Sequence, residues 1–270
     1  MSTLFLVHAH PDDESIGTGG VMLRAKRAGH RVVLVTCTRG EEGEIHNLPG
    51  GETLRDRLGE IRTQEMLRAG SILGLDRQEF LGYRDSGMAG IPSNLDPRSF
   101  HQAPLEESAE RLARLLREER PEVVVTYTAD GTYGHPDHIK AHQTTLAALA
   151  LVSAEGWEPE AVYLHAIPQS AVAQMEARAR ELGVVTPPAM ALRGTPDAEI
   201  ALRVDVRKDA ATKLSAFTAH VSQNAPDSPL RGMGEEILEA ALGTEAFVRW
   251  RGPDRVSGPD DDLFSGLEAG

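Results

Sequence analysis

Three long apolar, β-branched runs constrain this chain most strongly, and amphipathic segments separate them. The runs are Thr3–Val7, Arg31–Thr38 and Glu122–Tyr127. A continuous apolar run of this length is typical of a strand that is buried on both faces, as in a parallel sheet. Because a helical segment, Val21–Ala28, separates the first two runs, the N-terminal region is predicted to form a βαβ unit.

The rest of the chain continues the alternation. Further helices are predicted at Thr53–Leu73, Leu105–Glu119, Asp137–Val152, Ala171–Leu182, Lys208–His220 and Glu235–Leu242, and weaker strands at Glu79–Leu81, Ala161–Ala166 and Ile200–Val204. We therefore expect an α/β fold, a Rossmann-like mostly parallel sheet with helices on both faces and a smaller C-terminal portion. Residues 1–250 are predicted to form one domain, and residues 251–270 a partly flexible tail whose Leu263, Phe264 and Leu267 dock on the body.

Composition excludes several classes of protein. The 270 residues carry 28 Lys plus Arg against 41 Asp plus Glu, a net charge of −13, which argues against a nucleic-acid partner. One cysteine, Cys37, excludes an intrachain disulfide framework, and it lies in an apolar strand where it is expected to pack. No apolar run reaches about 18 residues, so no membrane span is expected. The N-terminal stretch lacks a basic region typical of a signal peptide, so a cytoplasmic protein is predicted.

Polar clusters follow the predicted strands. The clusters are His10–Glu14, Arg39–Glu44, Asp85 and Ala129–His138. Ligands of open parallel sheets bind outside the carboxyl ends of the strands. The four clusters are therefore expected at one edge of the sheet.

Two of these clusters share a pattern of histidine, proline and acid. His10–Asp13 reads HPDD and His135–His138 reads HPDH, and imidazole and carboxylate are ligands that zinc accepts. Spacing alone permits two histidine pairs, His135 with His138 or His138 with His142, since residues four apart share a helix face. Each aspartate has a structural alternative as a helix N-cap, and His142 is better explained as a solvent-facing or satisfied core histidine.

Other motifs are less informative. Gly17, Gly19 and Gly20 come too late after the first strand for a dinucleotide fingerprint and are expected in a turn that allows close helix packing. Arg62 either pairs with Glu65 or reaches a ligand. No G-x-S-x-G elbow supports a serine nucleophile.

Taken together, the motifs HPDDESIGTGG, TCTRGEEGEI, RDSGM and GHPDH resemble the LmbE-like, or PIG-L, family of zinc-dependent N-deacetylases. The resemblance implies that His10, Asp13 and His138 hold the metal. It further implies Asp12 as general base, His135 as the group that stabilises or protonates the tetrahedral intermediate, Asp137 as its orienting partner and Tyr133 as a donor to the amide carbonyl. Arg62, Asp85 and, more weakly, His220 fall at substrate-binding positions. The implied cofactor is Zn²⁺, although Fe²⁺ suits the same donors.

The resemblance also indicates a reaction. It is closest to the branch that acts on glucosamine-containing low-molecular-weight thiols, such as the mycothiol and bacillithiol pathways. We expect removal of the N-acetyl group from a small-molecule N-acetylglucosamine conjugate. Gly17 stands where some thiol amidases of the family carry lysine, which favours this reaction over an amidase of glucosaminyl-thiol S-conjugates. A non-catalytic sugar-binding protein is the alternative from another class. The sequence leaves homo-oligomerisation open.

Overall fold

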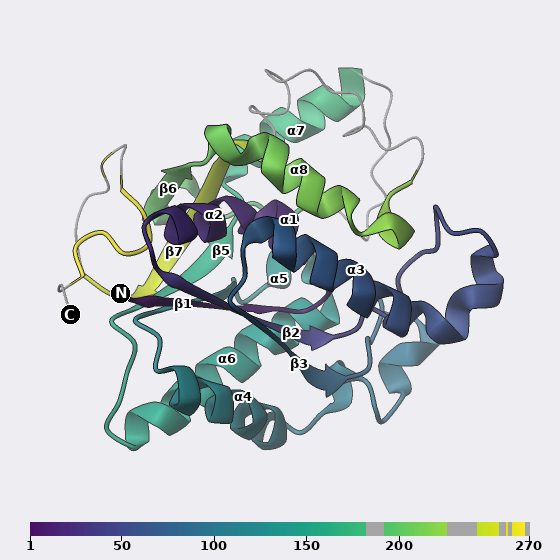
Figure 1. The fold of residues 1–270 in the computed structure, drawn as a ribbon, viewed down its shortest axis with the longest axis horizontal. Helices are drawn as coiled ribbons and strands as arrows, with labels where there is room; N and C mark the ends of the chain where they lie inside the picture. The colour runs from purple at the N-terminus through teal and green to yellow at the C-terminus, as the bar shows by residue number, and fades with distance from the viewer. Residues whose placement is uncertain (182–191, 226–241, 254–257, 259–260, 268–270) are drawn as a thin grey trace.

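The computed structural model describes residues 1–181, 192–225, 242–253, 258 and 261–267 (Figure 1). Within them, strands form one mixed sheet in the order β3-β2-β1-β4-β5-β7-β6. The strands are β1 (Thr3–His8), β2 (Arg31–Thr38), β3 (Arg77–Tyr83), β4 (Val123–Tyr127), β5 (Ala161–Ala166), β6 (Leu202–Asp205) and β7 (Thr244–Arg251). The pairs from β3 through β5 are parallel, whereas β7 runs antiparallel to both β5 and β6.

Helices cover both faces of the sheet (Figure 1). Helices α1, α2, α3 and α8 lie on one face, and α4 and α6 pack together on the other. The helices are α1 (Asp13–Gly17), α2 (Gly19–Arg27), α3 (Leu58–Leu73), α4 (Leu105–Glu119), α5 (Gly131–Gly134), α6 (Pro136–Ala154), α7 (Gln169–Glu181) and α8 (Ala210–Thr218). The predicted α/β fold class is confirmed. No helix in the described part of the chain is long and apolar enough to cross a membrane.

Strand β1 lies at the centre of both cores. Phe5 and Val7 pack toward α4 and α6, whereas Leu4 and Leu6 pack toward α2 and α3. This division follows from the two-residue period of a strand, and it explains why β1 is apolar at every position. The fully buried Cys37 belongs to the first of these cores, as predicted.

The order of the strands determines where in the sheet a ligand site is expected. The chain moves from β1 outward to β2 and β3 and then returns to the other side of β1 as β4. The connections that follow β1 and β4 therefore leave neighbouring strands in opposite directions. This is the topological switch point at which open α/β sheets bind their ligands.

Three sequence predictions need correction. Strand β7 was not predicted, and Thr53–Arg57 belongs to a 3₁₀ turn (Gly51–Arg57), so that α3 begins at Leu58. The expected turn at Gly17–Gly20 is confined to Thr18, because α1 ends at Gly17 and α2 begins at Gly19. The predicted helix Glu235–Leu242 falls almost entirely outside the described residues.

Close packing at the glycines of this segment is confirmed. A Cβ atom at Gly20 would lie 2.4 Å from Cβ of Val206, the residue that follows β6. The described part of the tail also docks, since Leu263 is buried and Phe264 stacks on His30 with 3.9 Å between ring centroids.

Candidate active site

A cavity of about 700 Å³ opens at the carboxyl ends of the strands. Residues after five strands line it, namely His10 after β1, Glu42 after β2, Asp85 after β3, His135 after β4 and Ile167 after β5. The prediction that the polar clusters share one sheet edge is thereby confirmed.

The turn after β1 presents a carboxylate to this cavity. Asp12 is the residue before α1 and has φ of 104°, a conformation that costs about 1–3 kcal/mol for a residue other than glycine. The Asp12 side chain makes no capping hydrogen bond, so the helix-cap alternative does not account for it. Its main-chain N–H donates to Glu14 Oε2 (2.9 Å), and Glu14 Oε1 in turn contacts His220 Nε2 (2.9 Å). The fully buried Glu14 and His220 thus support the strained turn from behind.

The turn after β4 presents two histidines. His135 precedes α6, and its Nδ1 accepts a hydrogen bond from the main-chain N–H of Asp137 (3.1 Å). Pro136 occupies the first helical position, where its missing N–H costs nothing. His138 follows within the first turn, so both imidazoles project from the start of α6.

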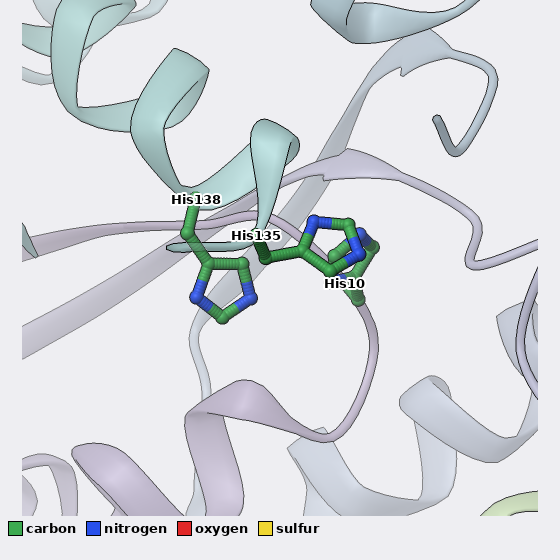
Figure 2. Close-up of side chains that lie close together, drawn as sticks. All are labelled: His10, His135 and His138. Carbon is green, nitrogen blue, oxygen red and sulfur yellow. The ribbon is translucent and has the colours of Figure 1, made fainter. Parts of the chain in front are cut away.

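Three imidazoles converge between the two turns (Figure 2). His10, His135 and His138 each offer a nitrogen, and these nitrogens lie within 4.8 Å of one another. Asp13 lies between two of these rings, with Oδ2 3.5 Å from Nδ1 of His10 and Oδ1 3.4 Å from Nε2 of His138. Asp13 thus contacts two of the predicted ligands, whereas the groups of three donors within 4.8 Å among the described residues are His10 with His135 and His138, and His10 with Asp85 and Asp137.

This donor set fits a metal ion. Two imidazoles and one carboxylate are the three protein ligands of many catalytic zinc sites. Oδ1 of Asp13 faces Nε2 of His138 and Oδ2 faces Nδ1 of His10, so the donor atoms of this set face one another. The ligand chemistry agrees with zinc and with iron alike.

The carboxylates of Asp85 and Asp137 lie beside Nε2 of His10, the ring nitrogen that does not face Asp13. Nε2 of His10 lies 3.2 Å from Oδ2 of Asp137 and 3.4 Å from Oδ1 of Asp85. Although burial opposes it, the charge of Asp85 and the hydrogen bonds to carboxylates raise the pKa of His10 well above its usual value. A carboxylate on the far nitrogen is the usual way in which proteins orient a metal-binding histidine.

Asp137 differs in detail from its predicted role. It holds His135 through its main-chain N–H, whereas its carboxylate bonds to His10 and to the main-chain N–H and hydroxyl of Ser86. Its carboxylate therefore orients the first histidine motif, and its backbone orients the second.

Asp12 has the properties of a base. Burial raises the pKa of Asp12 to about 6, while Arg62 opposes the shift from 3.1 Å. Arg62 also donates to the main-chain oxygens of Pro11 and Gly40, and its expected partner Glu65 instead accepts from Ser222. Arg62 therefore holds the Asp12 turn against the loop after β2.

Tyr133 and His135 lie beside the predicted metal ligands, and both can donate hydrogen bonds. The Tyr133 hydroxyl is 3.5 Å from Nε2 of His138, and burial raises the pKa of Tyr133, so the phenol stays protonated. Burial, with the charges of His10 and His138, lowers the pKa of His135 to about 2. Because Nδ1 of His135 accepts from Asp137, the proton of this neutral ring resides on Nε2.

Two other predicted residues differ in their access to the cavity. Asp85 lines it while accepting from the N–H groups of Glu42 and Gly87. His220 is buried behind Glu14 and does not line it. His142 is a satisfied core histidine as expected, since its Nδ1 contacts the main-chain oxygen of Tyr127 at 2.8 Å.

Sequence reasoning missed several residues of the site. His8, Tyr127 and His165 line the cavity from the ends of β1, β4 and β5. Each lies at the end of an apolar run that predicts a strand, and the run alone does not show that this residue faces a cavity. A histidine or tyrosine at the carboxyl end of such a run is the feature that could have indicated it.

The fold and this cluster define an α/β protein with a histidine–carboxylate site at the carboxyl edge of its sheet. The chain belongs to the PIG-L family, since the family model described as GlcNAc-PI de-N-acetylase matches residues 5–149.

The curated relatives extend the match. Two proteins named 1D-myo-inositol 2-acetamido-2-deoxy-alpha-D-glucopyranoside deacetylase, from Salinispora arenicola and Thermomonospora curvata, are each 41% identical over 98% of this chain. The alignments cover 91% and 96% of those proteins. Among solved structures, N,N'-diacetylchitobiose deacetylase from Pyrococcus horikoshii matches with a TM-score of 0.62 at 21% identity, over 92% of this chain and 83% of that one. At this identity the likeness shows the fold.

Proposed function

We propose that this protein is a zinc-dependent hydrolase that removes the N-acetyl group from an N-acetylglucosamine conjugate. The observation that carries the proposal is the placement of Asp13 between His10 and His138, with the Asp12 carboxylate beside them in the cavity. The names of the 41% identical relatives support the substrate class, a 2-acetamido-2-deoxyglucoside joined to inositol.

Each chemical role has a candidate residue. His10, Asp13 and His138 would hold the ion, which when bound supplies a strong nucleophile by lowering the pKa of water to about 7. Asp12 takes the proton of the attacking water, as a carboxylate with a pKa of about 6 does near neutral pH. The leaving amine needs one proton, and the proton that Asp12 has taken balances the reaction.

Two donors face the carbonyl oxygen as it gains charge. Tyr133 keeps its phenolic proton, and the neutral His135 carries its proton on Nε2. We propose that both donate hydrogen bonds to the developing oxyanion. In this proposal His135 stabilises the tetrahedral intermediate, and the main-chain N–H of Asp137 holds the His135 ring in place.

The sugar is proposed to bind on the side of the cavity that carries Arg62 and Asp85. Both line the cavity, so a hydroxyl-bearing ligand can reach them. His220 is proposed to act through Glu14 on the Asp12 turn, because it has no cavity surface of its own.

The test compares two substrates on the purified, zinc-loaded protein. We expect acetate release from N-acetylglucosaminyl-inositol and much slower release of mercapturate from a glucosaminyl-thiol S-conjugate. Faster mercapturate release would replace the proposal with the amidase. Turnover of neither substrate, with sugar binding retained, would favour the non-catalytic sugar-binding alternative. Metal analysis of the protein as purified, before zinc is added, decides between zinc and iron.

A further inference from the structure

We propose that Tyr127 is a positioning residue of the metal site, which fixes the carboxylate of Asp13 and the ring of His138 together. The inference rests on the proposed function, because it assigns these two residues as ligands. Tyr127 is the last residue of β4 and is 3% exposed, and no part of the proposed reaction uses it.

The Tyr127 hydroxyl can donate its single proton to only one of its three neighbours. It lies 2.7 Å from Oδ2 of Asp13, it accepts from the main-chain N–H of Ala9 (2.9 Å), and it lies 3.1 Å from Nδ1 of His8. Because an ionised carboxylate only accepts, the single hydroxyl proton goes to Asp13. Nδ1 of His8 must then be the donor to Tyr127, and Nε2 of His8 accepts from the Thr18 hydroxyl at 2.8 Å.

These hydrogen bonds occupy one oxygen of Asp13. Oδ2 accepts from the Tyr127 hydroxyl and from the main-chain N–H of His10 (2.8 Å). Oδ1 is the oxygen that faces Nε2 of His138, at 3.4 Å. The hydroxyl therefore holds the carboxylate so that one oxygen remains available to a metal ion.

The ring of Tyr127 acts on the other ligand. It stacks on the imidazole of His138, with 4.2 Å between centroids and 25° between planes. The main-chain oxygen of Tyr127 is held by His142 of α6, one helical turn beyond His138. One residue at the end of β4 thus contacts a ligand from the turn after β1 and a ligand from α6.

The test measures zinc affinity of the metal-free full chain by competition with a chromophoric chelator. Tyr127→Phe keeps the stacked ring and removes the hydroxyl, and loss of such an outer partner weakens metal binding by about 10- to 100-fold. Tyr83→Phe is the matched control, since the Tyr83 hydroxyl is also largely buried but contacts Glu107 (3.3 Å) outside the cavity. We expect wild-type affinity from this control.

The outcomes separate the inference from the proposed function. If the wild type binds no zinc, the proposed metal role of His10, Asp13 and His138 fails. If the wild type binds and Tyr127→Phe binds equally well, the role of Tyr127 is refuted. Should Tyr127→Phe fail to fold, His8→Leu removes the donor that orients the hydroxyl, and we expect a smaller loss of affinity. Unchanged affinity in a folded His8→Leu protein would then overturn the inference.

Discussion

At the scale of single residues, Asp12 combines a strained backbone with a carboxylate that lines the cavity. It adopts a positive φ, its side chain caps no helix end, and its carboxylate pairs with Arg62 at 3.1 Å. The ion pair serves the fold, whereas the exposure of the carboxylate to the cavity agrees with the proposed role as a base. The strain is supported by Glu14, which accepts the Asp12 main-chain N–H.

Replacing Asp12, the proposed base, should slow the reaction without unfolding the protein. Asp12→Asn keeps the shape of the side chain and removes its ability to take a proton, so we expect kcat to fall by about 10²- to 10⁴-fold. Zinc affinity and thermal stability should change little. Asp197→Asn, an exposed aspartate paired with Arg203, is the control and should keep full activity. Full activity in Asp12→Asn would remove Asp12 from the proposed mechanism.

A second residue-scale prediction concerns pH. The Lys26 ammonium and the Val32 N–H outweigh burial and lower the pKa of Asp76 below its usual value. Because the folded pKa lies below the unfolded one, this carboxylate stabilises the protein above the unfolded pKa and loses its effect as pH falls through the folded pKa. Asp76→Asn should cost less than about 1 kcal/mol at pH 7.

The measurement is urea unfolding of both proteins at several pH values. The difference in unfolding free energy between wild type and Asp76→Asn should shrink toward zero as the pH falls below about 4. A difference that grows in acid would contradict the assigned direction.

At the scale of elements, the sequence predicted the strands that carry the site and missed β7, which lies between β5 and the edge strand β6. The runs of β1, β2 and β4 are apolar throughout because both faces are covered. Strand β7 reads TEAFVRWR, in which charged residues interrupt the pattern, and its pairing with β5 and β6 stabilises it as a strand together with the buried Phe247. Tertiary pairing of this kind has no local sequence pattern.

The same limit applies within the site. Both histidine–proline–aspartate motifs could be predicted because their members are adjacent in the chain. The hydrogen bonds that join His8, Tyr127 and Asp13 could not be predicted, because Tyr127 is 119 and 114 positions away from His8 and Asp13 in the chain.

Glycine packing gives a prediction for helix α2. A Cβ atom at Gly20 would overlap Val206, whereas one at Gly17 would meet the edge of His165 at 3.1 Å. Gly20→Ala should therefore cost about 3 kcal/mol, the upper end of overpacking penalties. Gly17 is the last residue of α1, and Gly17→Ala requires the His165 ring to move only a few tenths of an ångström, so it should cost about 1 kcal/mol or less. Equal losses in urea unfolding of the two variants would contradict the packing argument.

A buried ion pair connects α8, β7 and α2. Glu245 of β7 lies 2.7 Å from Nζ of Lys213 and accepts the main-chain N–H groups of Gly20 and Val21, at 2.7 and 2.8 Å. Glu245→Gln leaves the Lys213 charge buried without its partner and should lower the unfolding free energy by about 3–5 kcal/mol. Asp197→Asn, which breaks an exposed pair, should cost far less. A comparable loss in both variants would mean that burial does not govern this pair.

At the scale of the whole molecule, the proposed metal site would join the two halves of the sheet. His10 and Asp13 follow β1, and His138 lies on α6 after β4, across the switch point of the strand order. Asp13 contacts one histidine from each of these connections. Because the net charge is −13, a bound cation also reduces repulsion among buried acids at this edge.

Zinc should therefore stabilise the entire fold and not only the site. A ligand that binds only the folded state at 100 times its Kd raises the unfolding free energy by about 2.7 kcal/mol, and a chelator should reverse the gain. His138→Ala should abolish the response to zinc, because it removes a ligand from one side of the switch point. His101→Ala removes an exposed histidine that does not line the cavity and should respond like the wild type. If zinc stabilised the wild type and His138→Ala equally, the ion would be binding elsewhere, and the ligand set His10, Asp13 and His138 would be wrong.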